Sequence, residues 1–416
     1  MLIMEEKKLS SRNMALFTAK EAIYVAVTPT LWGAIMQQFL LSRQVSDFLV
    51  GLHASLVSVV YMVSTMLFAG LSERTTTPLK HCTRVMLALA LFSAAYLPIT
   101  FWDLGPTATI LLVALLTVLL HFFHSCKYIY DYRINYQIIE PNRYGTMVFL
   151  SSALTGVGGV AFSWLFSYMI DHNTGGNPYF IFMVLTVVLL LATALINGRI
   201  KAIYPLPAVK VARKTLIQQL KEVFHEESFR KLLIPNLLRG VTLSVTGCIV
   251  LIAKVMGIDE SGRAKIPLAI ALATALASVV YLVLSKKLSV GAINIVGGAL
   301  TCALIFLPWN HTWGFLIVVF VGILGRIIVD NAVPTMLFPI IDPKIAGSYN
   351  AWRCVLYGAC SIVVTPIISA LVDVVHPLWL LIPGTVTYLG VTIWYYVVCR
   401  SLKKKPAMGK IAGDAK

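Results

Sequence analysis

The sequence is dominated by apolar stretches of about 20 residues that are separated by short polar breaks, and about 20 apolar residues are what an α-helix needs to cross a bilayer. Apolar residues make up 58% of the 416 residues and charged residues only 12%, whereas a soluble domain carries about 25% charged residues. The pattern therefore predicts an all-α membrane protein, and it leaves no polar stretch long enough for a separate soluble domain.

Twelve such stretches can be placed between charged or turn-forming residues. In the first half we expect transmembrane helices over 20–41, 47–70, 84–102, 106–129, 145–170 and 178–198. In the second half we expect them over 231–256, 266–285, 288–308, 313–337, 346–373 and 377–399. An even number of spans places both termini on the same side of the membrane.

The basic residues indicate which side that is. Most of the 34 Lys and Arg residues fall in the loops and tail on the side of the termini. Because cytoplasmic loops carry an excess of Lys and Arg, we expect both termini in the cytoplasm and the protein in the cell membrane, inner or plasma. Topology thus accounts for the net charge of +16, and we expect no nucleic-acid partner, since no folded domain carries a basic patch interleaved with aromatics.

A repeated loop sequence indicates two related halves. Residues 138–146 (IIEPNRYGT) and 340–348 (IIDPKIAGS) share their isoleucines, acid, proline, glycine and hydroxyl in register, at equivalent loops of the two halves. We expect two pseudo-symmetric six-helix bundles at 1–198 and 231–400, a cytoplasmic loop at 199–230, and a basic tail at 401–416. Spaced apolar residues in the loop favour a short amphipathic helix, with a simple tether as an equal alternative.

The loop after the second span carries Leu71, Glu73, Arg74 and Lys80. Together with the six-plus-six arrangement, these residues resemble the major facilitator superfamily, although two glycines of that family's loop signature are absent. The resemblance implies alternating access, in which two bundles rock about a central cavity. It also implies that Glu73 and Arg74 help to latch the inner gate; the alternative is that they only fix topology.

Three arginines and one acid are expected at membrane depth in the second half, namely Arg239, Arg326, Asp330 and Arg353. An ionisable group there costs about 2.5–3.5 kcal/mol on insertion scales, so it usually faces a cavity or a partner. Arg326 and Asp330 are spaced i,i+4 and can pair on one helix face. Arg239 and Arg353 have no obvious partner in their own half.

We interpret these arginines as lining a cavity for an anionic solute, because guanidinium binds carboxylate and phosphate bidentately. Tyr349 and Tyr357 lie one turn to either side of Arg353 and are expected to join the site. The alternative for Arg239 and Arg353 is that they snorkel to the inner surface. Arg326 lies too deep for that.

The first half offers a polar face on each of two spans. Candidate solute contacts are Tyr24 and Trp32, and candidate coupling or gating groups are Glu21, His121, His124 and Asp131. Titratable side chains of this kind can relay a proton that drives transport. The alternative is that the histidines only pack and that Asp131 is solvated together with Arg133. Two histidines alone do not specify a metal site.

Small residues on the fifth span, Ser152, Gly156, Gly159 and Ser163, share one helix face and predict a close packing seam. The resemblance implies that this seam faces the eighth span, over 266–285.

The sequence contains no catalytic motif and no ATP-binding loop, so we expect neither an enzyme nor a cofactor. We expect a monomeric secondary transporter that moves a small organic, anionic or amphipathic solute, coupled to a proton or sodium gradient. One alternative is a multidrug exporter, which would depend on Tyr349 or Trp352. Another is a membrane sensor or scaffold that does not transport.

Overall fold

The structure is a computed structural model that describes residues 2–139, 143–172, 177–204, 218, 227–306, 311–337, 346–372 and 374–404. Every regular element within these ranges is helical. The first half contains α1 (Leu2–Trp32), α2 (Ala34–Ser42), α3 (Asp47–Arg74), α4 (Pro78–Ser93), α5 (Tyr96–Phe101), α6 (Pro106–Ile138), α7 (Tyr144–Asp171) and α8 (Pro178–Gly198). The second half contains α10 (Glu227–Gly247), α11 (Ile249–Val255), α12 (Glu260–Ala264), α13 (Ile266–Leu284), α14 (Val290–Thr301), the 3-10 helix η2 (Cys302–Phe306), α15 (Thr312–Leu337), α16 (Ala346–Leu371) and α17 (Pro377–Lys404).

Within these described ranges, nine helices are long and apolar enough to cross a membrane, or ten if the bent pair α10–α11 counts as one span. This confirms an all-helical, multi-pass membrane protein. Two predicted spans fall outside that set. The span at 20–41 is divided between α1 and α2, and the span at 288–308 contains α14, which has only 12 residues.

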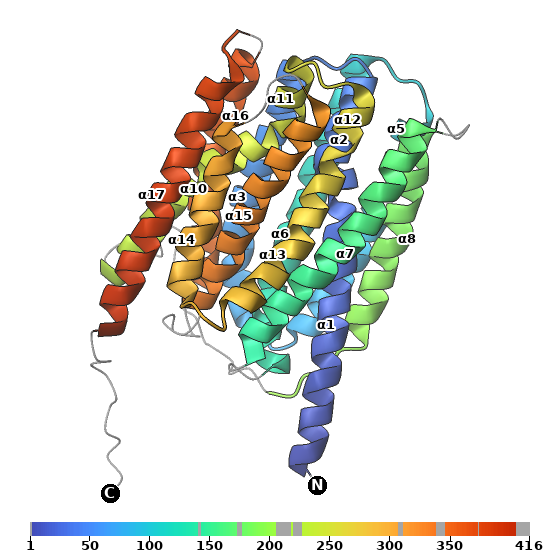
Figure 1. Ribbon diagram of the computed structural model, residues 1–416. Helices are drawn as coiled ribbons and strands as arrows, with labels where there is room; N and C mark the ends of the chain where they lie inside the picture. Colours follow the sequence, from blue (N-terminus) through green and yellow to red (C-terminus); the bar gives the residue numbers. More distant parts are fainter. Residues whose placement is uncertain are drawn as a thin grey trace, which may run out of the picture.

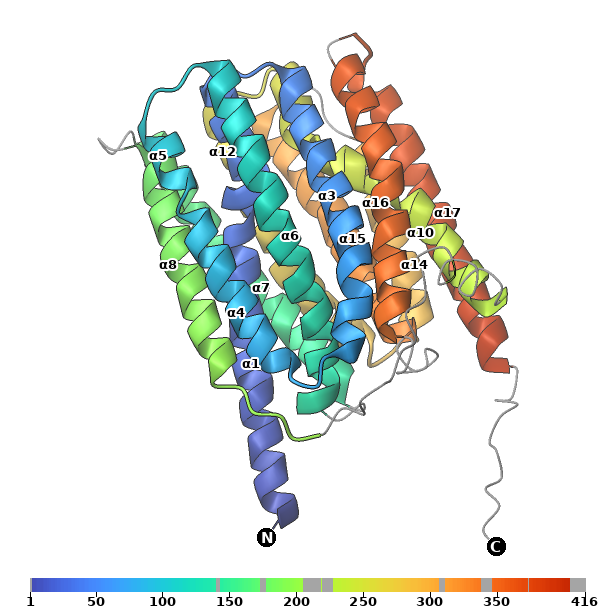
Figure 2. The same ribbon diagram turned by 180° about the vertical axis from the view of Figure 1, so that it is seen from behind.

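The helices of each half pack mainly among themselves. In the first half α1 packs on α7 and α8, while α6 packs on α3 and α4; in the second half α10 packs on α16 and α17, while α15 packs on α13 and α14. The halves meet where α3 lies along α16 and where α7 lies along α13. The start of α1 and the end of α17 lie at the same end of the molecule, here called the terminal end; the opposite end is called the far end (Figures 1 and 2).

The first helix of the chain is interrupted near its middle. Proline has no backbone N–H, so Pro29 cannot donate to the carbonyl of Val25. The Thr28 hydroxyl donates to that carbonyl instead, at 2.8 Å. Helix α1 then ends at Trp32, and α2 begins at Ala34 after Gly33. The helix is therefore broken within one turn of Pro29.

The first helix of the second half is interrupted in a similar way. Helices α10 and α11 are bent by 46° at Cys248. The side-chain amide of Gln37 donates to the carbonyl of Gly247 at 2.8 Å, so α2 of the first half holds this bend. The two interrupted helices thus meet each other across the middle of the molecule.

The predicted small-residue seam on α7 packs against α13, the eighth expected span, which confirms that expectation. A Cβ placed on Gly156 would lie 2.2 Å from the backbone nitrogen of Ala275 and 2.3 Å from its Cα. By contrast, a Cβ on Gly158 would come no closer than 3.5 Å to Ala26. The two helices can approach this closely only because Gly156 has no side chain.

Replacing Gly156 with alanine is therefore expected to lower the free energy of unfolding by roughly 1–3 kcal/mol, the usual cost of forcing an extra carbon into a packed interior. The melting temperature of the purified protein measures this. Gly158→Ala, two residues along the same helix, is the matched control and should leave the melting temperature almost unchanged. Equal effects of the two substitutions would contradict the close approach at Gly156.

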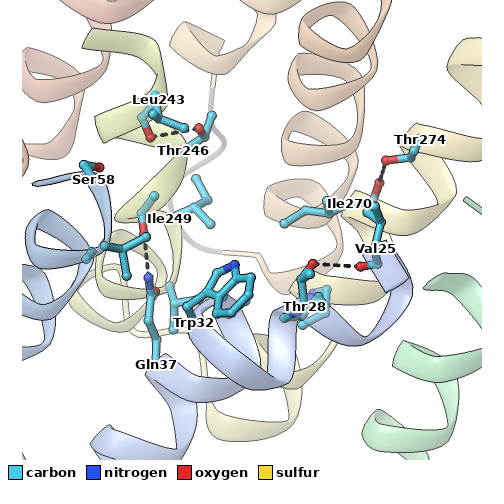
Figure 3. Close-up of a pocket in the computed structure, with 18 of the residues that line it drawn as sticks. Val25, Thr28, Trp32, Gln37, Ser58, Leu243, Thr246, Ile249, Ile270 and Thr274 are labelled. Atoms are coloured by element: carbon cyan, nitrogen blue, oxygen red, sulfur yellow. Dashed lines mark hydrogen bonds between the residues drawn. The ribbon is translucent and has the colours of Figure 1, made fainter. Parts of the chain in front are cut away.

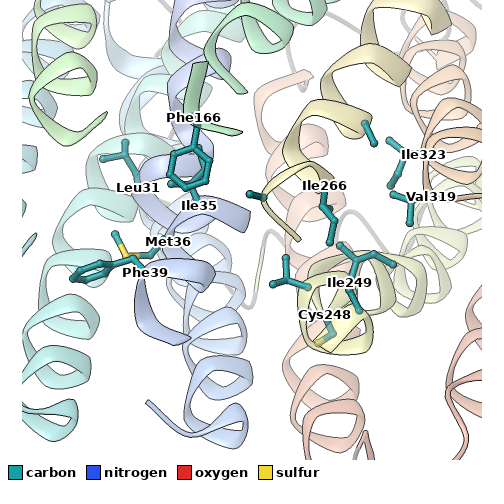
Figure 4. Packing of buried hydrophobic residues seen from close by; sticks show 14 of the residues in the cluster. Leu31, Ile35, Met36, Phe39, Phe166, Cys248, Ile249, Ile266, Val319 and Ile323 are labelled. Carbon is teal, nitrogen blue, oxygen red and sulfur yellow. The ribbon is translucent and has the colours of Figure 1, made fainter. Parts of the chain in front are cut away.

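The buried apolar residues among those described form three clusters, and the largest of them spans both halves. Its first-half part includes Leu31, Ile35, Met36 and Phe39 of α1–α2, and its second-half part is built around α11, α13 and α15 (Figure 4). This packing fixes both interrupted helices against their own halves, and so it positions the residues between them.

The structure corrects two predicted boundaries. Helix α1 begins at Leu2 instead of residue 20, and α6 continues to Ile138 instead of ending near 129. Lys127, close to the end of the span expected over 106–129, therefore lies well inside α6. The amphipathic helix predicted in the loop at 199–230 lies mostly outside the described residues, as do residues 140–142 and 340–345 of the two repeated segments.

Candidate functional site

A cavity of about 550 Å³ lies between the two halves, near the middle of the helices. Residues of α1, α2, α3, α6 and α7 line it from one half, and residues of α10, α11, α13, α15 and α16 from the other. Trp32 projects into the cavity between the α10–α11 bend, marked by Thr246 and Ile249, and the α13 residues Ile270 and Thr274 (Figure 3).

The described lining is mostly apolar, with a small set of polar groups. The most polar members are Gln37, Tyr61, His121, His124, Thr246, Arg326 and Tyr357. Arg326 is the charged side chain in this lining, and the described lining contains no carboxylate. An apolar chamber with a few convergent polar groups is the usual form of a small-molecule site.

Arg326 belongs to a cluster of three charged side chains. Its Nε lies 3.4 Å from Oδ2 of Asp330, one turn away on α15, and its Nη1 donates to the Thr246 hydroxyl at 2.5 Å. Arg239 of α10 is almost fully buried, and its Nη2 forms an ion pair with Oδ1 of Asp330. Asp330 therefore holds two guanidinium groups from two helices.

The three side chains carry one positive charge in excess, because two guanidinium groups share one carboxylate. The predicted i,i+4 pairing of Arg326 with Asp330 is present. The expectation that Arg239 lacks a partner in its own half is wrong, because α15 brings Asp330 against it. Arg239 also lies over the ring of Tyr357, 5.3 Å from its centroid, and so supports a residue of the cavity wall.

The first half contains a second buried cluster, called here the ion cluster, made of Lys20 and Glu21 of α1 with Lys127 and Asp131 of α6. Lys20 Nζ lies 2.5 Å from Asp131 Oδ1, and Lys127 Nζ lies 2.6 Å from Asp131 Oδ2 and 2.7 Å from Glu21 Oε1. The exposed fractions of the two lysine side chains are only 0% and 2%. The two positive and two negative charges balance, as buried charges require.

This arrangement overturns the alternative in which Asp131 is a solvated residue. Its side chain is 8% exposed and is held between two buried ammonium groups. Glu21 is the most exposed member of the ion cluster, at 18%.

A cation–π contact followed by a hydrogen bond joins the ion cluster to the cavity. Lys127 Nζ lies 4.1 Å from the centroid of the Tyr24 ring, and the Tyr24 hydroxyl lies 2.5 Å from Nδ1 of His124. His124 lines the cavity beside Trp32, whose ring centroid is 5.1 Å from the histidine ring and 4.2 Å from that of His121. Tyr24 thus stands between the buried charges and the cavity wall.

Polar contacts between the halves close the far end of the cavity. Lys254 of α11 forms an ion pair with Asp47 of α3, at 2.5 Å. The Gln38 amide donates to the carbonyl of Arg263 at 2.6 Å. These contacts lie beyond the cavity on the side away from the termini.

Other contacts join the halves on the terminal side of the cavity. Asn331 donates to the Ser152 hydroxyl at 3.0 Å, and the Arg353 guanidinium donates to the Tyr128 hydroxyl at 3.3 Å. The rings of Phe149 and Tyr281 stack with centroids 3.5 Å apart. The cavity therefore lies between two sets of contacts that hold the halves together.

The structure brings five of the predicted site residues to the cavity: Trp32, His121, His124, Arg326 and Tyr357. Six others lie behind its wall or beside it, namely Glu21, Tyr24, Asp131, Arg239, Asp330 and Arg353. The side chains of Glu73, Arg74 and Tyr349 lie outside the described part of the chain. Trp352 packs in a second-half core with Val329 and Tyr388, away from the cavity lining.

Sequence reasoning missed four residues of these sites. Lys20 and Lys127 belong to the ion cluster, and Gln37 and Thr246 line the cavity at the helix bend. The adjacent pair Lys20–Glu21 and the i,i+4 pair Lys127–Asp131 were available as signals. Nothing in the sequence indicated that Gln37 and Thr246 face each other across the two halves.

Comparison with known proteins is consistent with this architecture. Curated protein sequences give no match to the chain. Among solved structures, a bacterial homologue of the iron transporter ferroportin in the outward-facing state is similar, with a TM-score of 0.64 at 12% identity over 95% of this chain and 99% of the other. The same kind of protein with soaked iron gives a TM-score of 0.63 at 11% identity, with the same coverage. At this level of identity the similarity concerns the fold alone.

The predicted family relationship is confirmed by a match to a family model. The model described as the Major Facilitator Superfamily matches residues 14–365, which cover both halves and nearly all of the cavity-lining helices. The chain belongs to the Major Facilitator Superfamily and is a multi-pass membrane transport protein.

Proposed function

We propose that this protein is a secondary transporter for a small organic anion with an apolar body. The observation that carries the proposal is the position of Arg326, a guanidinium group at the wall of an otherwise apolar chamber between the halves. Because Arg239 already forms an ion pair with Asp330, the cluster keeps one excess positive charge beside the cavity. A carboxylate that accepts hydrogen bonds from Arg326 would balance that charge.

The rest of the chamber favours an amphipathic solute. Trp32, Ile249 and Ile270 offer apolar contact area around the guanidinium group. The same apolar lining is compatible with the second candidate, an exporter of hydrophobic compounds. That candidate does not require Arg326, so the two functions make opposite predictions for uncharged solutes.

A metal cation fits the chamber poorly, although the similar solved structures belong to a homologue of an iron transporter. In the described part of the chain, no group of three or more His, Cys, Asp or Glu residues is placed to hold a metal ion. A guanidinium group at the wall also repels cations. The geometry therefore favours an organic anion over iron.

Matched pairs of carboxylates and amides test the preference for an anion. Benzoate with benzamide, and phenylacetate with phenylacetamide, differ mainly in charge. A ligand that binds the folded state raises its apparent stability. We expect carboxylates to raise the melting temperature of the purified protein and the matching amides to leave it unchanged. Equal shifts for both would favour the exporter of hydrophobic compounds, and a shift with ferrous iron alone would refute the anion proposal.

For the membrane topology we propose twelve spans in two six-helix bundles, at 1–198 and 231–400, with α1–α2, α10–α11 and α14–η2 each counted as one span. The packing of helices within each half supports this division. We further propose that the terminal end is cytoplasmic, because basic residues such as Lys80, Arg84 and Lys286 lie at that end of their helices.

We also propose that the coupling ion is a proton and that the ion cluster with Tyr24 and His124 carries it. Buried lysine and carboxylate groups on α1 and α6 can exchange a proton while the cluster stays close to neutral. The Tyr24 hydroxyl contacts His124, which lines the cavity. A proton passed from the cluster to His124 by way of Tyr24 would change the charge next to the bound anion.

Removing the Tyr24 hydroxyl should separate solute binding from proton coupling. We expect Tyr24→Phe to retain exchange of internal for external solute, because the ring and its packing remain. Accumulation driven by an imposed pH gradient should fall about tenfold or more, since general proton transfer by a positioned group contributes at least that much. Uptake into proteoliposomes with and without a pH gradient measures both activities. Unchanged gradient-driven accumulation in Tyr24→Phe would contradict this path.

A further inference from the structure

A groove of about 410 Å³ opens on the membrane-facing surface where the two halves meet. Its walls come from α7 in the first half and from α13 and α15 in the second. The side chains of Trp164, Trp313 and Ile317 on its rim are 57%, 62% and 60% exposed. Tryptophan and tyrosine are enriched where a helix reaches the level of lipid headgroups. The groove therefore runs along the hydrocarbon layer and ends near the headgroups at the far end.

The far end of this groove is polar and carries both signs of charge. Asp171 at the end of α7 accepts a hydrogen bond from the Ser261 hydroxyl at 2.6 Å, and its Oδ2 lies 3.3 Å from Lys265 Nζ. Lys265 also donates to Ser261 at 2.8 Å. His172 stacks on the ring of Tyr168, with centroids 4.1 Å apart. Asp171 and Lys265 thus form a pair that bridges the two halves at the end of the groove.

Neither member of this pair is saturated by its partners. An ammonium group has three donors, and a carboxylate has about four positions that accept a hydrogen bond. Lys265 uses one donor on Ser261 and directs another toward Asp171, while Asp171 accepts from Ser261 and faces Lys265. The two side chains are 27% and 26% exposed, so each retains an accessible position beside the groove.

We propose that this groove binds a phospholipid whose headgroup carries a primary ammonium group, that is, a phosphatidylethanolamine. One acyl chain lies in the apolar groove between Trp164 and Trp313. A phosphate oxygen accepts a hydrogen bond from Lys265, and the lipid ammonium donates to Asp171. The four charges then alternate in sign.

Other common lipids meet this site less well. Phosphatidylcholine carries a quaternary ammonium without an N–H, so it cannot donate to Asp171. Phosphatidylglycerol has no ammonium group to pair with Asp171, so Lys265 alone would have to balance both the lipid phosphate and the Asp171 carboxylate. The pair of opposite charges, instead of a patch of one sign, is what selects a zwitterionic lipid with a free amine.

The groove also crosses the seam along which α7 and α13 pack. A lipid bound to Asp171 and Lys265 contacts both halves at once. Its binding would therefore strengthen the contact between the halves at the far end.

Quenching of tryptophan fluorescence by brominated lipids tests the proposal on the full-length protein. The protein is reconstituted in phosphatidylcholine vesicles that contain a small fraction of brominated phosphatidylethanolamine, brominated phosphatidylcholine or brominated phosphatidylglycerol. The part of the quenching that is lost in the Trp164→Phe/Trp313→Phe variant measures how much brominated lipid lies in the groove. Trp379 and Trp394, which are exposed on α17, remain as a control for bulk lipid.

A partly exposed ion pair contributes only a small free energy of binding. We therefore expect phosphatidylethanolamine to be enriched at the groove about two- to fivefold over phosphatidylcholine. Asp171→Asn should abolish this enrichment, with no change at the control tryptophans. Equal quenching by the three lipids, or a preference for phosphatidylglycerol, in the wild-type protein would overturn the proposal. So would an enrichment that persists in Asp171→Asn.

Discussion

Replacing Arg326 with alanine is expected to reduce transport of a carboxylate solute at least about 30-fold, because truncating one partner of a buried charged hydrogen bond costs about 2–5 kcal/mol. Arg326 is the charged side chain in the described cavity lining. Without it, a carboxylate in the chamber meets Trp32 and aliphatic side chains and has no cation to balance it. Exchange of labelled benzoate or phenylacetate across proteoliposomes measures the loss.

The same substitution should leave the protein folded. Asp330 keeps its ion pair with Arg239 when Arg326 is removed, so no buried carboxylate is left alone. Arg326→Lys is the matched variant: it retains the charge but loses the planar fork, and we expect partial transport. Arg43→Gln, at an exposed pair with Asp103 on the far end, should transport normally. Carboxylate exchange at the wild-type rate in Arg326→Ala, at equal protein amount, would contradict the proposed site.

Replacing Lys127 with methionine is expected to have the largest effect on stability, a loss of roughly 3–5 kcal/mol in the free energy of unfolding. Lys127 neutralises Glu21 and Asp131 inside the first half. Methionine fills most of the space but leaves two carboxylates facing Lys20 alone. The buried excess of negative charge, more than the lost contacts, causes the loss.

A second substitution that restores neutrality should recover part of this stability. In Lys127→Met/Asp131→Asn, Lys20 and Glu21 remain as a balanced pair 3.2 Å apart. We expect the double variant to be more stable than the sum of the single effects by about 1–3 kcal/mol. Melting temperatures and urea unfolding in detergent measure all three variants. Additive effects would indicate that the ion cluster is not coupled as described.

Much of the fold was predictable from sequence, because a helix that crosses lipid must be apolar over a fixed length. The spacing of residues along a helix places Trp32 on the polar face of the first span. It also places His121 and His124 on one face of α6, and Arg326 and Asp330 on one face of α15. Contacts within a single helix depend only on spacing. Those predictions agree with the structure.

Contacts between helices were harder to predict. Arg239 appeared to lack a partner because its pairing with Asp330 depends on how α10 packs against α15. The span expected over 106–129 ended just after Lys127, because a hydropathy window ends a span where charges begin. Those charges are buried because α1 supplies residues of opposite charge that pair with them. A hydropathy average over one helix contains no information about a charged residue on another helix.

The position of the cavity also explains how one site can serve both sides of the membrane. Lys254 and Asp47 join the halves on the far side, and Asn331 and Ser152 join them on the terminal side. We propose that rocking of the halves breaks one set of contacts while the other set holds. The interrupted helices α1–α2 and α10–α11 lie where such a motion would bend the bundles.

The most direct test of the account is a density map of the protein with an iodinated carboxylate, chosen as the counterpart of the carboxylate that raises the melting temperature most. We expect iodine density inside the chamber near Trp32 and a carboxylate within hydrogen-bond distance of the Arg326 guanidinium. A carboxylate bound elsewhere on the molecule, with Arg326 still held only by Thr246 and Asp330, would contradict it.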